Sequence, residues 1–302
     1  MNLNFLLPNH QCLTNKTNNI HSKNVIFKSS LKIKKPLNKD VISFKGVCNN
    51  EQKPYTDKMF QIPDFKQQNP AFPDNGSYYC GPASVSNSLF YLKENGYPDI
   101  TNNKSQVELV KELATYFKTN PDSGSTVNDF CNGLNNFIKD KGYTVKKLEY
   151  QGYRPIDKFK NSNIPKLDDI KQAIEKNCVV FLLFGFYQKP VINNGKVVYK
   201  RDDGHWTTLV GHSFDGSNFN SNYLVVHDPF HSNIKAIENR YIELQQLHNG
   251  ILKPNINDKE STLQQNAAGY YKINKGIDYL DKNQLVSILD GVVILELEKP
   301  QS

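Results

Sequence analysis

The order of two hydrophobic periodicities along the chain restricts its fold more than any other feature. Apolar residues recur at helical spacing in three segments between residues 82 and 141, whereas from residue 178 onward they form strand-length runs. We predict helices over residues 82–95, 105–117, 126–141 and 167–176. Helices that precede a run of strands are typical of the α+β class. The sequence therefore predicts an N-terminal helical part followed by an antiparallel β-sheet.

Capping residues mark the ends of these helices. Pro82 suits the first turn of a helix, because it lacks an amide hydrogen that would stay unpaired there, and Gly96 ends this helix. Ser105 and Glu108 have the spacing of a capping box at the start of the second helix. Gly142 follows the third helix as a C-terminal stop.

The strand signals begin with an apolar run over residues 178–186. Asn193-Asn-Gly195 separates two short β-prone segments and predicts a hairpin. We expect further strands over residues 205–211, 223–227 and 292–297, with a short helix over 283–289 before the last of them.

Charge divides the chain into two parts. Of the net charge of +7, all belongs to residues 1–58, which hold ten Lys against three acidic residues, while residues 59–302 hold 27 basic and 27 acidic residues. We interpret 1–58 as a basic tail or targeting segment and 59–302 as one domain. A neutral domain does not indicate a nucleic-acid partner. No apolar run reaches the roughly 18 residues of a membrane span.

The N-terminal segment carries no clear targeting signal. No Lys or Arg precedes the short apolar stretch over residues 3–8, which argues against a secretory signal. The segment before Asp40 contains no acidic residue, and in this respect it is similar to an organelle transit peptide. It is, however, rich in Lys and Asn rather than in Arg and Ser. The compartment therefore stays open.

One of the five cysteines is a candidate nucleophile. Their odd number and the absence of Cys-x-x-Cys argue against a disulfide framework and a structural zinc site. Cys131 lies on the apolar face of a predicted helix and Cys178 opens a buried strand, so both are expected in the core. Cys80 immediately precedes a helix, where the helix dipole favours the thiolate. By position alone, a core role and a catalytic role for Cys80 both remain open.

A nucleophilic cysteine needs a neighbouring base and a group that orients this base. His205 and His212 lie seven residues apart on a predicted strand, so only one of them can face Cys80. His205 lies at the start of this strand, and Asp228 ends the next one. If the two strands are neighbours, Asp228 can hold one ring nitrogen of His205 and leave the other for the thiol.

Three segments carry a resemblance to a known family. Tyr79-Cys-Gly-Pro-Ala-Ser84, Gly204-His-Trp-Thr-Thr-Leu-Val-Gly211 and Tyr223-Leu-Val-Val-His-Asp-Pro229 resemble the papain-like, bacteriocin-processing (double-glycine leader) cysteine peptidases of the family 39 type. The resemblance covers residues 60–235, which leaves 236–302 as a C-terminal extension. It implies a papain-like fold with Cys80 as nucleophile, His205 as general base and Asp228 as orienting acid.

Two positions depart from this family. Its members usually place a Gln a few residues before the cysteine as a donor to the oxyanion, whereas Asp74 stands six residues before Cys80 and cannot donate. We therefore assign the oxyanion role to the neighbouring Asn75, together with the backbone amide of Cys80. His212 stands where relatives commonly carry an aromatic residue, and we expect it to pack or hydrogen-bond on the far face of the sheet.

The sequence thus predicts a thiol hydrolase, most simply a cysteine peptidase that acts on a peptide or protein and needs no cofactor. An acyl or peptidyl transferase or a deamidase could use the same residues, although the absence of Cys after residue 178 disfavours the phytochelatin synthase type. A papain-like scaffold that binds peptides without cleaving them is another alternative. A zinc site formed by His205, His227, Asp228 and His231 is a rival interpretation. The substrate sequence and the oligomeric state stay open.

Overall fold

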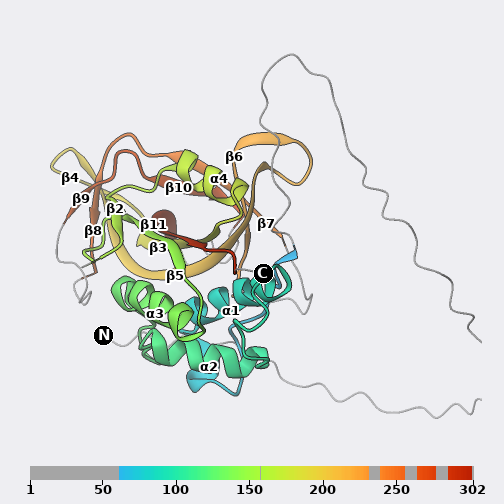
Figure 1. Ribbon diagram of the computed structural model, residues 1–302. Helices are drawn as coiled ribbons and strands as arrows, with labels where there is room; N and C mark the ends of the chain where they lie inside the picture. Colours follow the sequence, from blue (N-terminus) through green and yellow to red (C-terminus); the bar gives the residue numbers. More distant parts are fainter. Residues whose placement is uncertain (1–60, 157, 231–238, 256–263, 277–284, 301–302) are drawn as a thin grey trace, which may run out of the picture. The chain divides into compact units, whose positions relative to one another are not determined.

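The computed structural model of the protein describes residues 61–300, apart from residue 157 and the segments 231–238, 256–263 and 277–284. In these residues the chain is a mixed α+β domain with a large β-sheet and four α-helices (Figure 1). The predicted basic segment 1–58 lies outside the described residues. No helix of the described residues is long and apolar enough to cross a membrane.

The four helices form where the sequence predicts them. They are α1 (Cys80–Glu94), α2 (Gln106–Tyr116), α3 (Val127–Asp140) and α4 (Leu167–Glu175). Helix α1 begins at Cys80, two residues before Pro82, and follows a short 3-10 turn, η2 (Pro73–Gly76). The predicted capping box is confirmed, because the Ser105 side chain accepts from the Glu108 amide while the Glu108 carboxylate accepts from the Ser105 amide.

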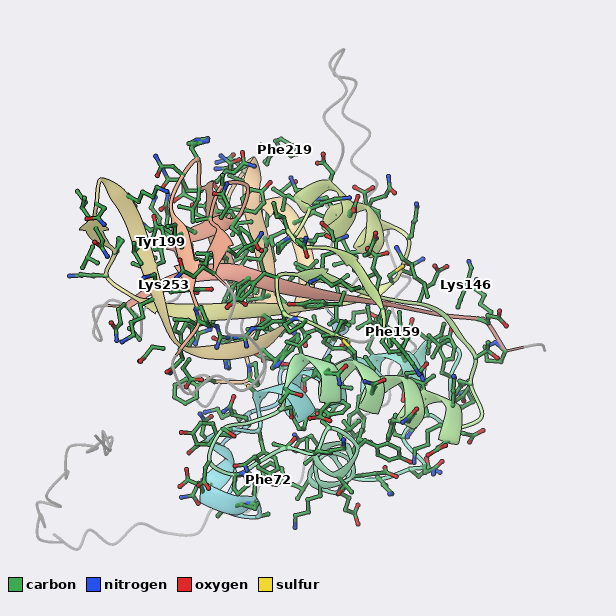
Figure 2. All side chains as sticks on the ribbon, turned by 90° about the vertical axis from the view of Figure 1, so that its left-hand side faces the viewer. Phe72, Lys146, Phe159, Tyr199, Phe219 and Lys253 are labelled. Atoms are coloured by element: carbon green, nitrogen blue, oxygen red, sulfur yellow. The ribbon has the colours of Figure 1, made fainter. Side chains whose placement is uncertain are left out.

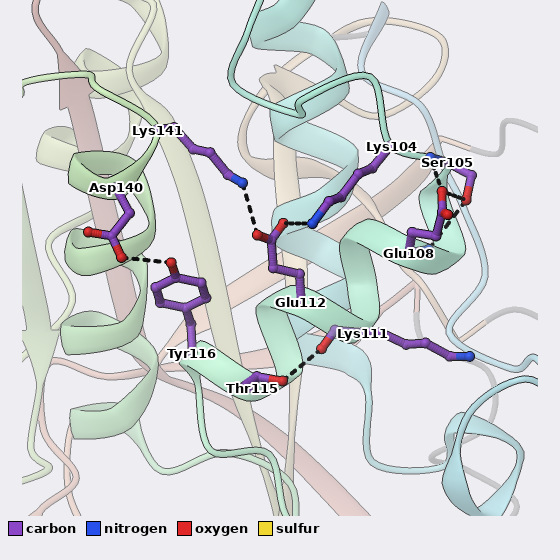
Figure 3. Close-up of polar contacts among 9 residues, drawn as sticks. All are labelled: Lys104, Ser105, Glu108, Lys111, Glu112, Thr115, Tyr116, Asp140 and Lys141. Atoms are coloured by element: carbon purple, nitrogen blue, oxygen red, sulfur yellow. Dashed lines mark hydrogen bonds and ion pairs between the residues drawn. The ribbon is translucent and has the colours of Figure 1, made fainter.

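Polar contacts attach α2 to its surroundings (Figure 3). The Glu112 carboxylate lies 3.1 Å from Nζ of Lys104, which precedes α2, and 2.9 Å from Nζ of Lys141, which follows α3. The Tyr116 hydroxyl donates to Asp140 of α3 at 2.7 Å, a bond that raises the pKa of Tyr116 to about 12. These contacts hold α2 against α3 on the side of the domain that also carries α1.

The sheet order is β2-β1-β11-β10-β7-β6-β5-β8-β9, with β3 between β11 and β5 and β4 paired to β5. The strands are β1 (Val145–Gly152), β2 (Lys160–Ser162), β3 (Val179–Gln188), β4 (Val191–Asn193), β5 (Lys196–Phe214), β6 (Phe219–His227), β7 (Arg240–Gln246), β8 (Ile251–Lys253), β9 (Gln265–Asn266), β10 (Tyr271–Lys275) and β11 (Leu285–Leu297). Most neighbours are antiparallel, as predicted. The sheet departs from the predicted antiparallel pairing at two places, because β1 pairs with β2 and β5 pairs with β8 in parallel.

The predicted helix over residues 283–289 is wrong. Residues 283 and 284 lie outside the described residues, and from Leu285 onward the chain forms β11. This strand pairs with β3 from Leu285 to Leu295 and with β1 from Gly291 to Leu297. A short apolar segment fits a buried strand as well as a helix, and here pairing with β3 and, at Ile288 and Leu289, with β10 decides the outcome. Strands β10 and β11 show that the C-terminal extension contributes to the sheet.

The sheet separates two hydrophobic clusters, and β3 contributes to both. Val179, Phe181 and Leu183 pack with α1, α2 and α3, whereas Val180 and Leu182 pack with α4. Figure 1 accordingly shows α1–α3 on one side of the sheet and α4 on the other. Such burial on both faces explains why this segment is a continuous apolar run. Cys131 and Cys178 lie in these clusters, as predicted.

A buried ion pair links β11 to β5, the strand that carries His205. Arg201 Nε donates to Oδ2 of the fully buried Asp290 at 2.9 Å, and the Tyr187 hydroxyl donates to the same oxygen at 3.0 Å. Gly185 and Gly204 make room for this pair, because a Cβ at either position would collide with Asp290 or Arg201. The pair therefore depends on three adjacent strands.

We expect Asp290→Asn to lower the free energy of unfolding by about 3 kcal/mol, because it leaves the Arg201 guanidinium buried without a counter-ion. Chemical denaturation of both proteins measures this difference. Glu296→Gln is the matched control, since it removes the carboxylate that pairs with the exposed Lys146 and should cost less than about 1 kcal/mol (Figure 2). An Asp290→Asn protein as stable as the wild type would contradict the prediction.

Candidate active site

The segment before Cys80 is anchored through one buried glutamine. Gln67 is 1% exposed, and its Nε2 donates to the carbonyl oxygens of Gly76 and Ser77 at 3.0 and 2.9 Å. Its backbone amide donates to the carbonyl oxygen of Pro229 at 2.9 Å. Gly76 has φ of +80°, and a Cβ there would collide with the Gln67 backbone. The approach to Cys80 is thereby joined to the residues that follow Asp228.

Helix α1 is docked on β5 beside His205. The Ser84 hydroxyl donates to the Trp206 carbonyl at 3.1 Å, and the Thr208 hydroxyl donates to the Ser84 carbonyl at 3.0 Å. Cys80 is the first residue of α1 and is partly exposed. The first four amides of a helix have no partner within the helix, so the Cys80 sulfur lies where the helix dipole is positive.

His205 and Asp228 meet because β5 and β6 are antiparallel neighbours, with Thr208 opposite His227. His205 Nε2 lies 2.6 Å from Asp228 Oδ1, and the two side chains are 7% and 1% exposed. Cys80 lies close enough to His205 to contribute to the raised pKa of this residue. Since Nε2 is paired with Asp228, Nδ1 is the ring nitrogen that remains for Cys80. Three of the predicted site residues are thus brought together from α1, β5 and the end of β6.

The charges of His205 and Asp228 stabilise one another. Burial alone would lower the pKa of His205, but Asp228 and the nearby Cys80 outweigh burial and raise it to about 10. Burial alone would raise the pKa of Asp228, but His205, Arg240 and the Phe230 amide bring it below its ordinary value. Arg240 Nε lies 3.7 Å from Asp228 Oδ2, and the Phe230 amide donates to Oδ1 at 2.9 Å. This arrangement favours an imidazolium paired with a carboxylate.

The remaining predicted residues have separate surroundings. Asn75 is exposed on η2, five residues before Cys80, in a left-handed conformation with φ of +50°. His212 is hydrogen-bonded to Ser213 at 2.9 Å and lies 3.3 Å from Glu175 of α4, so that it belongs to the α4 side of the sheet, as expected.

The rival zinc interpretation gains no support from the described residues. His227 Nε2 is bonded to Asn239 at 2.8 Å, and His205 is bonded to Asp228. Among the residues that the structure describes, no group of three or more His, Cys, Asp or Glu side chains could hold a metal ion. His231 lies outside the described residues.

Sequence reasoning missed three residues that surround the site, namely Gln67, Arg240 and Phe230. Gln67 and Arg240 reach it from distant parts of the chain, and no local pattern marks either of them. The rings of Phe186 and Phe230 flank His205, each with its centroid 6.3 Å from the imidazole. Phe230 follows the Asp228-Pro229 end of β6, and this proximity to the motif is the signal that could have indicated it.

Residues 59–249 match the Peptidase_C39 like family, which is 191 of the 302 residues. The chain belongs to this family. Membership in the C39-like family indicates a cysteine peptidase with a peptide or protein substrate. The match ends before β10 and β11, although both strands belong to the same sheet. A search of the curated proteins found no match.

Proposed function

We propose that this C39-like protein is a papain-like thiol hydrolase that cleaves a peptide bond with Cys80, His205 and Asp228 as its catalytic triad. The observation that carries the proposal is the position of the His205 ring, whose Nε2 lies 2.6 Å from Asp228 Oδ1 and whose pKa is raised by both Asp228 and Cys80. Nucleophilic acyl transfer requires a nucleophile, a base beside it and an acid that orients the base, and Cys80, His205 and Asp228 would supply these three groups in this order.

The proposed reaction proceeds in two steps. The Cys80 thiolate attacks the scissile carbonyl carbon, and His205 gives its proton to the leaving amine as the C–N bond breaks. The acyl group is then held as a thioester on Cys80. Water attacks this thioester and loses its proton to His205, so that the acid is released and the Cys80 thiolate leaves. Asp228 holds the ring and stabilises its charge throughout.

We propose Asn75 and the backbone amide of Cys80 as donors to the oxyanion of the tetrahedral intermediate. The amide of the first helical residue is supported by the helix geometry, which leaves it without a partner within α1. For Asn75 the support is its exposed position on η2, five residues before Cys80 in the anchored segment. The side chain of Gln67 is less available, because its Nε2 already donates to two carbonyls.

An electrophilic peptide probe tests the proposal. We expect a peptidyl vinyl sulfone to label the native protein at Cys80, because its thiol is partly exposed beside His205, and to spare the buried Cys131 and Cys178. Peptide mapping by mass spectrometry locates the label. A His205→Ala variant should be labelled at least about tenfold more slowly, since the base that activates the thiol is removed. Equal labelling rates in both proteins would contradict the triad.

A further inference from the structure

Two phenyl rings lie near the His205 imidazole, each with its centroid 6.3 Å from that of the imidazole. The ring of Phe186, from β3, is stacked at an interplanar angle of 24°, and the ring of Phe230 is perpendicular at 79°. Phe186 is half-buried against the α4-side cluster. Phe230 is 42% exposed, although its backbone amide is bonded to the buried Asp228.

The position of Phe230 is fixed through its backbone. Its amide donates to Asp228 Oδ1 at 2.9 Å, and the carbonyl of the preceding Pro229 accepts from the Gln67 amide at 2.9 Å. The exposed ring is therefore held next to His205 by the same contacts that hold the carboxylate. An apolar surface fixed in this way is suited to binding rather than to core packing.

The chemistry of the proposed reaction determines which part of a substrate meets these rings. His205 must give a proton to the leaving amine, so the amine nitrogen lies within hydrogen-bond distance, about 3 Å, of the imidazole. The side chain of the leaving residue begins only two bonds from that nitrogen. The first residue after the scissile bond is thus placed beside the groups that flank His205.

We propose that Phe230 and Phe186 form a subsite for a large apolar side chain at the first position after the scissile bond. This inference rests on the proposed function and names its substrate class, which is a peptide with an aromatic or large aliphatic residue at that position. Apolar contact with the two rings favours such a residue over glycine by about tenfold or more.

Acyl transfer to small amines tests this subsite without knowledge of the natural substrate. A peptide methyl ester acylates Cys80 and releases methanol, and phenylalaninamide and glycinamide at equal concentration then compete for the acyl-enzyme. The amine nitrogen attacks the thioester carbon, the C–S bond breaks, and the amine proton passes to His205. The ratio of the two amide products reports the preference at the subsite and is independent of the acylation rate.

Phe219 provides a matched control for Phe230. It is 41% exposed and pairs with Phe214, nine residues along β5 from His205. Both ribbon views place this part of the sheet on the side away from α1–α3, and Figure 2 labels Phe219 there. Phe219→Ala removes about as much exposed apolar surface as Phe230→Ala does, at a position away from His205.

We expect the wild-type protein to form the phenylalaninamide product in about tenfold excess or more, Phe230→Ala to reduce this ratio to within about threefold of unity, and Phe230→Leu to retain part of it. Phe219→Ala should keep the wild-type ratio. Equal products from the wild type, or an equal loss of the ratio in Phe219→Ala, would overturn the subsite while leaving the hydrolase intact. Failure of the ester to form any acyl-enzyme would instead overturn the proposed function, and the subsite with it.

Discussion

Cys80→Ala is expected to abolish turnover, with a loss of at least about 10,000-fold in kcat/KM, because no other group of the site can form the thioester. The substitution removes one sulfur atom at a partly exposed position at the start of α1. The fold should therefore persist, and the loss should be chemical. Peptide hydrolysis and intact-protein mass spectrometry after incubation with a peptide ester measure turnover and acyl-enzyme separately.

Cys131→Ala and Cys178→Ala are the matched controls, since both remove a thiol from the hydrophobic clusters. They should retain activity and lose only stability. A Cys80→Ala protein that still hydrolyses the peptide would refute the assigned nucleophile. If the wild type binds a peptide with the same affinity as Cys80→Ala and neither forms an acyl-enzyme, the chain is a peptide-binding module rather than an enzyme.

Asp228→Asn is expected to lower kcat by about 100- to 10,000-fold, because the amide neither stabilises the imidazolium nor fixes the ring in the required tautomer. Asp228 raises the pKa of His205 from 6.5 to about 10, with help from Cys80. Loss of its charge should move the alkaline limb of the kcat/KM profile to lower pH. Profiles of the two proteins between pH 5 and about 10.5 measure both effects.

Stability should show the same coupling. Because folding raises the pKa of His205, the pairing with Asp228 contributes fully below pH 6.5 and is lost as the pH rises through about 10. Because folding lowers the pKa of Asp228, its own contribution is lost as the pH falls through that lowered value.

The second histidine–carboxylate pair of the sheet is the control for Asp228→Asn. Glu175 of α4 lies with its Oε1 3.3 Å from Nε2 of His212 on β5. Glu175→Gln alters this pair and should leave both kcat and the alkaline limb of the kcat/KM profile unchanged. A similar shift in the two variants would mean that the pH dependence does not report His205.

Local patterns predicted the helices well, because their ends are determined by nearby residues. Ser105 caps α2 through contacts three residues away, and Asn194 and Gly195 adopt the positive φ that the β4–β5 hairpin requires. The same patterns failed over residues 285–289, where pairing with β3 and β10 outweighs local propensity. The parallel strands β2 and β8 could not be predicted from the sequence either, because strands of three residues have little hydrophobic periodicity of their own.

The sequence by itself determined the α+β order, a helix start within two residues of Cys80 and the three motifs that carry the family resemblance. Tertiary structure alone decided which side chains meet, since His205 and Asp228 are 23 residues apart and come together only through the register of β5 and β6. It also decided the roles of Gln67, Arg240 and Phe230, whose contacts with the site cross between elements distant in the chain. Spacing along a chain limits which face a residue occupies, whereas proximity depends on packing between elements, which no local pattern records.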